Sequence, residues 1–246
     1  MTRDIVFDHV YKKYDKTDVL IDINLEIFAG EIITIIGRSG CGKTTALKLV
    51  NGLLKPDAGN VFVKGENVST CDNISLRRRV GYVIQNIGLF PHLTVGKNIA
   101  YVPSLGGMWD RETEKAEIAR LLTMVGLDPV FAERYPSELS GGQQQRVGIA
   151  RAVAAKPDIL LMDEPFGAVD GITRRALQEE LLRLRDELEL TILFVTHDIE
   201  EALKLGTRVV VMADGRVAQA GTASRIKEEP ASDFVKALVM GNLDRA

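Results

Sequence analysis

The stretch GRSGCGKT, Gly37 to Thr44, constrains the fold of this chain more than any other feature, because of what flanks it. The apolar run IITIIG (32–37) precedes it and predicts a strand, and TTALKLVNGLL (44–54) follows it with apolar residues at helical spacing. A strand, a loop of the form G-x-x-x-x-G-K-[ST] and a helix make a cradle for phosphate, because glycines let backbone N–H groups face phosphate oxygens. The pattern therefore predicts an α/β fold with a phosphate site.

Each residue type in this phosphate loop (37–44) has a role in that prediction. Lys43 supplies positive charge to the β- and γ-phosphates, and Thr44 supplies a hydroxyl for Mg²⁺. Cys41 is interpreted as a small filler rather than a nucleophile. The predicted nucleotide contacts here are Gly37, Arg38, Ser39, Gly40, Cys41, Gly42, Lys43, Thr44 and Thr45. The alternative is a glycine-rich turn that binds nothing.

Short apolar runs and amphipathic segments alternate along most of the chain, which predicts a mainly parallel sheet covered on both faces. Further strands are expected at 5–10, 23–31, 61–65, 79–85, 158–165, 191–197 and 207–215. Helices are expected at 114–126, 143–155, 172–188, 198–206 and 233–239.

The region from 86 to 155 is broken by proline and glycine and then carries two of these helices. It is predicted to be a helical subdomain inserted into an α/β core made of 1–85 and 156–246. The whole of 1–246 is then one domain, with an antiparallel β region near its start.

Two further strands are expected to end in polar residues. In ILLMDEP, four apolar residues lead to Asp163, a predicted Mg²⁺ ligand, and then to Glu164, a predicted base for an attacking water. His197 follows the apolar run TILFVT and is predicted to sense the γ-phosphate. Ligands of open α/β sheets bind at the carboxyl edge where such strands end. The alternative is an acidic pair and a histidine with structural roles only.

The stretch LSGGQQQR (139–146) makes a second small cradle. It places a serine hydroxyl and two glycines before a predicted helix, whose N-terminus attracts anions. The alternative is that Ser140, Gly141 and Gly142 merely start the helix.

Over essentially its whole length, the chain resembles the ATP-binding subunits of ABC transporters. The resemblance rests on six motifs that occur in the order found in that family. These are Tyr14, GRSGCGKT, Gln85, LSGGQ, ILLMDE with GAVD after it, and His197. The resemblance implies ATP and Mg²⁺ as ligands and ATP hydrolysis as the activity. A GTPase would need an Asn-Lys-x-Asp guanine reader, and the chain has none.

The resemblance also implies that two copies pair head to tail, so that LSGGQ of one copy closes over the ATP held by the other. Ser140, Gly141, Gly142 and Gln143 would contact that nucleotide. Tyr14 would stack on adenine, and Gln85 would contact Mg²⁺ and water. Asp170 would link the two active sites, although Gly167 and Val169 depart from the residues usual beside it.

Composition excludes some classes of function. The net charge of −3, from 31 basic and 34 acidic residues, gives no basic field for nucleic acid. The start of the chain has no signal-peptide pattern, and the apolar runs are too short to span a bilayer. The expected location is cytoplasmic, peripheral on the inner face of the cell membrane.

The segment 86–110 has aromatic and apolar residues in a Pro/Gly-broken region, which favours a surface for a partner. Phe90, Leu93 and Ile99 could instead fill the core of the helical subdomain. In transporter relatives this region receives a helix of the membrane permease.

The amino-acid sequence most resembles the ATPases of importers for quaternary ammonium osmoprotectants, and these importers also use a solute-binding protein. The alternatives are another ABC importer, an exporter or a non-transport ABC ATPase. Because the chain stops at Ala246, regulation through an attached domain is not expected.

Overall fold

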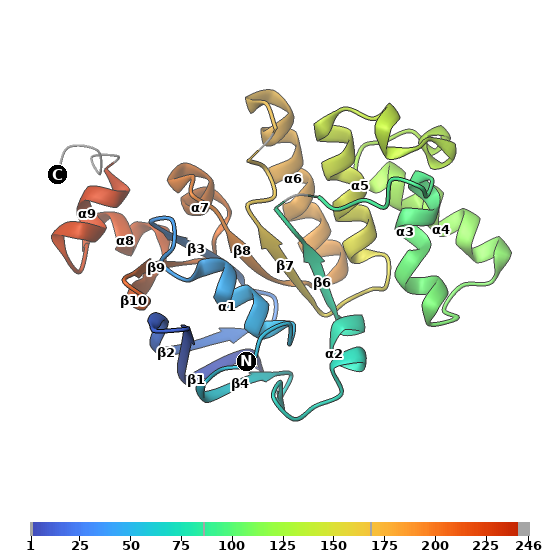
Figure 1. Cartoon of the computed structure of the whole chain (residues 1–246). Helices are drawn as coiled ribbons and strands as arrows, with labels where there is room; N and C mark the ends of the chain where they lie inside the picture. The colour runs from blue at the N-terminus through green and yellow to red at the C-terminus, as the bar shows by residue number, and fades with distance from the viewer. Residues whose placement is uncertain (1, 86, 168, 241–246) are drawn as a thin grey trace. The chain divides into compact units, whose positions relative to one another are not determined.

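The structure is a computed structural model that describes residues 2–85, 87–167 and 169–240 (Figure 1). The chain divides into two compact units, which are described separately. Unit 1 comprises 1–77 and 191–246, and unit 2 comprises 78–190. This division differs from the predicted boundaries at 85/86 and 155/156, because unit 2 holds strands as well as helices. The division into compact units does not test where a helical subdomain begins and ends, so the boundaries at 85/86 and 155/156 stay a prediction.

Unit 1 contains an antiparallel sheet in the order β2-β1-β4-β5. β1 and β2 form a long hairpin that closes where Tyr14 pairs with Thr17. Register shifts interrupt this hairpin, and His9, at a φ of 48°, lies in one of them. The strand bounds are Arg3–Tyr14, Thr17–Phe28, Ala58–Val63 and Glu66–Asn67 for β1, β2, β4 and β5.

Unit 1 also contains the strands β10, β9, β3 and β8, in that order. β3 pairs in parallel with β8 and β9, and all residues of β3 and β8 are buried, as the apolar runs predict. Helices α7, α8 and α9 pack around β3 and β9 through a buried cluster that includes Ile36, Val211 and Val235. The bounds are Ile32–Gly37 (β3), Thr191–Val195 (β8), Arg208–Ala213 (β9) and Arg216–Gly221 (β10). Those of the helices are Lys43–Val50 (α1), Ile199–Leu205 (α7), Ala223–Glu228 (α8) and Asp233–Val239 (α9).

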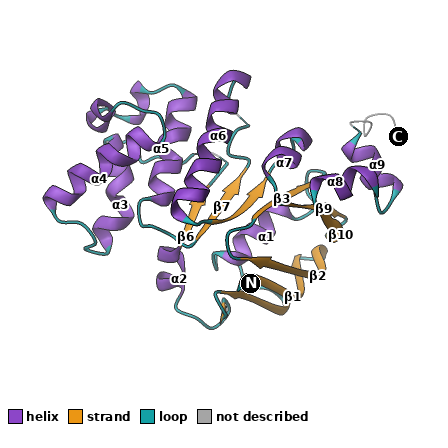
Figure 2. Ribbon diagram, turned by 180° about the vertical axis from the view of Figure 1, so that it is seen from behind, coloured by secondary structure: helices purple, strands orange, loops and turns teal. Residues whose placement is uncertain are grey.

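In unit 2, β6 pairs in parallel with the fully buried β7, and α5 packs against β6 (Figure 2). Helices α3, α4 and α5 contact one another and form the helical part of the unit. The bounds are Val80–Val83 (β6), Val95–Leu105 (α3), Arg111–Met124 (α4), Gly141–Val153 (α5), Ile159–Asp163 (β7) and Gly171–Leu188 (α6). Two 3₁₀ turns, Pro129–Glu133 and Pro136–Glu138, lie between α4 and α5. A short helix, α2 (Asn73–Arg79), spans the boundary between the units.

The predicted α/β class, with its antiparallel region and its parallel strands, is confirmed. Two predicted boundaries were wrong, and several elements were not predicted. α1 ends at Val50 rather than 54, because Asn51 caps it and Gly52 turns the chain at a φ of 65°. β6 ends at Val83, so that Gln85 lies beyond the strand rather than at its end. Helices α2, α3 and α8 and strands β5 and β10 were not predicted, and α3 contains Pro103, which the sequence pattern treats as a break.

Candidate functional site

The phosphate loop connects β3 to α1 in unit 1, as its flanks predict. Gly37, Gly40 and Gly42 have positive φ values of 156°, 80° and 101°. A Cβ on Gly37 would lie 2.3 Å from the Met212 carbonyl oxygen, and one on Gly42 would lie 2.7 Å from that of Val19. Two of the glycines are therefore required by close backbone approach. The N-cap of α1 is Gly42, which has no capping side chain, so the helix begins with amides available to an anion.

Lys43 folds back over this loop. Its Nζ donates hydrogen bonds to the carbonyl oxygens of Gly37 (2.8 Å) and Arg38 (3.1 Å), which hold a buried positive charge at the loop. Cys41 is 7% exposed, and its burial raises the pKa of the thiol. The charge of Lys43 beside it opposes this effect, but the pKa remains above its usual value. A thiol kept neutral is a poor nucleophile, which supports a filling role.

The hairpin of β1 and β2 approaches the same loop. Besides its approach to the Val19 carbonyl, a Cβ on Gly42 would lie 2.5 Å from Leu20 Cδ2. A pocket of about 290 Å³ is lined by Asp18 and Val19 together with loop residues 38–41. Tyr14 pairs with Thr17 just before these residues and is 45% exposed, with the Lys12 Nζ 5.9 Å from its ring centroid. An aromatic face is thus available on the hairpin that borders the phosphate loop.

In unit 2, β7 ends at Asp163, as predicted. The residue is only 4% exposed, and a buried carboxylate requires compensation by hydrogen bonds or a cation. Tyr82 of the neighbouring strand β6 hydrogen-bonds to it. Burial raises the Tyr82 pKa most, and the Asp163 charge and hydrogen bond raise it further.

Glu164 follows in a left-handed conformation, with a φ of 47°. A side chain other than glycine adopts this conformation at a cost of about 1–3 kcal/mol, and such strain concentrates at functional sites. Gln85 Nε2 donates a hydrogen bond of 3.1 Å to Glu164 Oε2. The structure therefore brings together Gln85 and Glu164, two of the predicted catalytic residues.

The second cradle lies at the start of α5, also in unit 2. Ser140 Oγ accepts a hydrogen bond from the Gln143 N–H (3.3 Å), and Gln143 Oε1 accepts one from the Ser140 N–H (2.9 Å). This reciprocal capping box fixes the serine at the helix N-terminus. Ser140 and Gly141 are exposed, so a hydroxyl proton and the first helix amides can reach an anion.

Asp170 borders this second cradle. It caps α6 by accepting hydrogen bonds from the N–H groups of Ile172 (3.1 Å) and Thr173 (3.0 Å), and bonds from Thr173 and Ile172 lower its pKa. A pocket of about 540 Å³ is lined by Asp170, Thr173 and Val169 together with residues 140–143. The loop before α6 and the start of α5 therefore share one surface.

His197 is exposed and lies two residues after the end of β8 in unit 1. Its neighbours Thr196 and Asp198 are both hydrogen-bonded to Glu201 of α7. The sequence reasoning missed these partners. The available signal was the spacing Asp198-x-x-Glu201, which has the form of a helix capping box.

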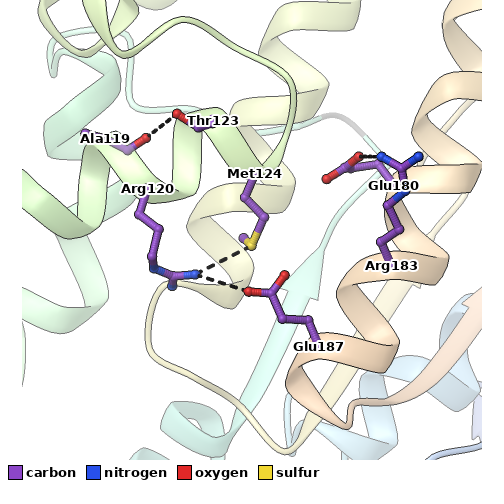
Figure 3. A pocket seen from close by; sticks show the side chains of 7 residues that line it. All are labelled: Ala119, Arg120, Thr123, Met124, Glu180, Arg183 and Glu187. Carbon is purple, nitrogen blue, oxygen red and sulfur yellow. Dashed lines mark hydrogen bonds and ion pairs between the residues drawn. The ribbon is translucent and has the colours of Figure 1, made fainter.

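One further hollow, of about 470 Å³, lies between α4 and α6 (Figure 3). Arg120 there contacts Glu187 (3.9 Å), and Arg183 contacts Glu180 (3.5 Å). None of the predicted site residues lines it, and its charges are paired with one another.

Over the part of the chain that the structure describes, no three His, Cys, Asp or Glu side chains group as a metal site. An Mg²⁺ ion here would depend on phosphate oxygens as well as protein ligands. In the same described part, no helix has the length and apolar character needed to cross a membrane.

The fold and the phosphate loop define a P-loop nucleotide-binding protein. Residues 20–167 match the family "ABC transporter", and the chain belongs to this family. The resemblance inferred from the motifs is therefore confirmed.

Two relatives within this family have names that state a transported solute. The chain is 48% identical, over 96% of its length, to the choline transport ATP-binding protein OpuBA of Bacillus subtilis. It is 47% identical, over 94% of its length, to the osmoprotectant import ATP-binding protein OsmV of Salmonella typhimurium. The chain spans 62% and 60% of the lengths of these two relatives.

A solved structure has the same fold. The ATP-binding cassette MJ0796, in a dimeric post-hydrolysis state with bound ADP and Pi, superposes with a TM-score of 0.82 at 34% identity. The match covers 89% of this chain and 98% of that one.

Proposed function

We propose that this chain is the ATP-hydrolysing subunit of an ABC importer, working as a head-to-tail pair of identical copies. The observation that carries the proposal is that the chain has two anion cradles, one in each unit. The first is a complete phosphate loop with its lysine, and the second is a capped helix start without a lysine. A second cradle with no nucleotide loop of its own fits a nucleotide that is bound by another copy. The dimeric, ADP-bound MJ0796 cassette supports this pairing.

The residues of the chain then have distinct roles in hydrolysis. The phosphate loop amides and Lys43 bind and orient the phosphates, and Tyr14 stacks on adenine. Glu164 takes a proton from the attacking water, and Gln85 orients that carboxylate through its hydrogen bond. His197 contacts the γ-phosphate, and Asp170 borders the second cradle, where it connects the two active sites.

The donor set also fits Mg²⁺. Thr44 supplies a hydroxyl, Gln85 an amide oxygen and Asp163 a buried carboxylate, and these hard oxygen ligands are what Mg²⁺ prefers. When bound, the ion neutralises phosphate charge. Asp163 would hold the ion through a water molecule.

The membrane partners are a permease pair and, indirectly, a solute-binding protein. α3 and the turn after it expose Tyr101 (38%), Leu105 (64%) and Met108 (50%), and this apolar surface fits contact with a permease. Ile99 is buried, and Phe90 and Leu93 are partly buried, which supports the core interpretation for these three residues. The chain then lies on the cytoplasmic face of the membrane.

The proposed solute class is quaternary ammonium osmoprotectants, because the two relatives described above are named as ATP-binding proteins of choline transport and of osmoprotectant import. The alternatives are another ABC importer or an exporter. In cells that carry the chain with the permease genes beside its own, uptake of labelled glycine betaine supports the proposal. Export, or uptake of a different solute only, supports an alternative.

Phosphate release from Mg-ATP tests the ATPase itself. Lys43→Ala should abolish it, because the positive charge at the loop is lost. Lys48→Ala is the matched control, since Lys48 lies in the same helix near its other end. Normal turnover in Lys43→Ala would overturn the assignment of the phosphate site.

A further inference from the structure

The two residues beside His197 are both hydrogen-bonded to Glu201, one to its buried carboxylate and the other to its backbone N–H. Thr196, between β8 and His197, is 2% exposed. Its Oγ1 donates a hydrogen bond of 2.6 Å to Glu201 Oε2 and accepts one of 3.0 Å from the Asp198 N–H. Glu201, in the first turn of α7, is 5% exposed.

A second link closes the network. The Glu201 N–H donates a hydrogen bond of 3.0 Å to Asp198 Oδ1, which caps α7. Both neighbours of His197 are therefore hydrogen-bonded to Glu201, Thr196 through the carboxylate and Asp198 through the backbone N–H. The Thr196 hydroxyl also joins the two neighbours directly, because it accepts the Asp198 N–H. The short bond from Thr196 has the length of a charge-assisted O–H···O⁻ bond.

Helix capping alone does not explain this arrangement. Asp198 caps α7 without help from Thr196, and burying the Glu201 carboxylate is costly unless it is hydrogen-bonded. The two hydrogen bonds of the Thr196 hydroxyl also fix the backbone conformation from Thr196 to Asp198, and therefore at His197.

We propose that Glu201 is a positioning residue, which acts through Thr196 to fix the direction of the His197 imidazole. The inference rests on the proposed function for its catalytic consequence, since His197 is there the γ-phosphate contact. A displacement of a catalytic group by about 1 Å can lower a rate by roughly 100-fold.

The same strand offers a matched control at its other end. Thr191, the first residue of β8, donates a hydrogen bond of 2.6 Å to Asp4 Oδ2. Asp4 is 2% exposed and forms an ion pair of 3.0 Å with Lys64. In both sites a buried threonine hydroxyl donates to a buried carboxylate, but only Thr196 flanks His197.

The test compares Thr196→Val with Thr191→Val by two measurements. The chain has three histidines, His9, His92 and His197, so a sample labelled with ¹⁵N-histidine gives few imidazole signals, and loss of one in His197→Ala assigns it. We expect Thr196→Val to move the His197 signal and leave the other two in place. Thr191→Val should move none of the three.

The second measurement is steady-state ATP hydrolysis. Thr196→Val should lower kcat by about 10- to 100-fold with little change in KM, and Thr196→Ser, which keeps the hydroxyl, should restore most of it. In a His197→Ala background, Thr196→Val should have no further effect, because the group it positions is gone. Thr191→Val should leave kcat unchanged. If Thr196→Val does not fold, Glu201→Gln and Glu201→Ala give the same comparison, since glutamine keeps an acceptor oxygen.

An unmoved His197 signal in Thr196→Val, or a loss of kcat that adds fully to that of His197→Ala, would overturn the inference. Failure of the proposed function looks different. In that case the wild-type chain hydrolyses no ATP, while the imidazole signals still report whether Thr196 and Glu201 orient His197.

Discussion

At the scale of single residues, Glu164 combines a left-handed conformation with a place at the end of a buried strand and a hydrogen bond from Gln85. Its φ is 47°, and the strand before it is fully buried. Removing its charge without changing its shape should abolish proton transfer and leave nucleotide contacts intact.

Glu164→Gln is therefore expected to bind ATP normally and to lower turnover by about 10²-fold or more. The ATP-bound pair should accumulate, which size-exclusion chromatography with ATP measures. Glu189→Gln is the control, because Glu189 also has a positive φ (52°) but lies at the end of α6. A Glu164→Gln variant that stays monomeric with ATP would contradict the sandwich.

Tyr14 gives a second prediction at this scale. Loss of the ring in Tyr14→Ala should weaken ATP binding by a few-fold to about 100-fold, the range that about 1–3 kcal/mol of stacking implies. Calorimetry measures the affinity. Tyr14→Phe should retain it, and Tyr11→Ala, an exposed tyrosine of the same strand, should not change it. Equal affinity of Tyr14→Ala and wild type would remove Tyr14 from the site.

The sequence predicted those site residues whose place is set by a local motif or by the end of an apolar strand. Asp163 ends β7 and His197 lies two residues after β8, as the apolar runs before them predict. Lys43 is the first residue of α1, as the phosphate-loop pattern predicts. The contacts among side chains could not be predicted in this way. The bond from Gln85 to Glu164 depends on how two loops far apart in sequence fold, and that information is not in either motif.

At the scale of elements, long apolar or amphipathic segments were predictable and interrupted ones were not. β7 and α6 follow from continuous patterns, whereas α3 was hidden by Pro103 and by the glycines after it. The buried Asn98 of α3 joins the helix to the segment before it, because its side chain accepts the Phe90 N–H and donates to the Phe90 carbonyl. Tertiary contacts of this kind override the local pattern.

The start of α5 carries the prediction at this scale. Ser140→Arg places a bulky charged side chain at a helix N-terminus that should contact the partner's nucleotide. Hydrolysis should fall by about 10²-fold or more, since a transition-state contact is lost. ATP binding to the isolated chain should stay near normal, because the phosphate loop lies in the other unit.

Fluorescent-nucleotide titration and phosphate release measure the two effects separately. Ser137→Arg is the control, because Ser137 is also exposed and precedes α5 but lies in the preceding 3₁₀ turn. If Ser140→Arg abolishes binding to the isolated chain, the second cradle belongs to the same copy's nucleotide and the assignment is wrong.

At the scale of the whole molecule, the distribution of site residues between two units makes the oligomeric state part of the chemistry. Lys43 and His197 belong to unit 1, whereas Glu164 and Ser140 belong to unit 2. If Ser140 serves the nucleotide of another copy, no single chain has a complete pocket. The rate of hydrolysis per molecule must then depend on concentration.

With ATP saturating, dilution should lower the rate per molecule roughly in proportion to concentration once most chains are monomeric, because pairing then limits the reaction. ATP bound per molecule, measured at the same dilutions, should stay constant, since the phosphate loop is complete in each chain. Phosphate release and light scattering on the same samples relate rate to pairing. A rate per molecule that stays constant while light scattering reports only monomer would show that one chain holds a complete active site, and the head-to-tail pair would then have no role in hydrolysis.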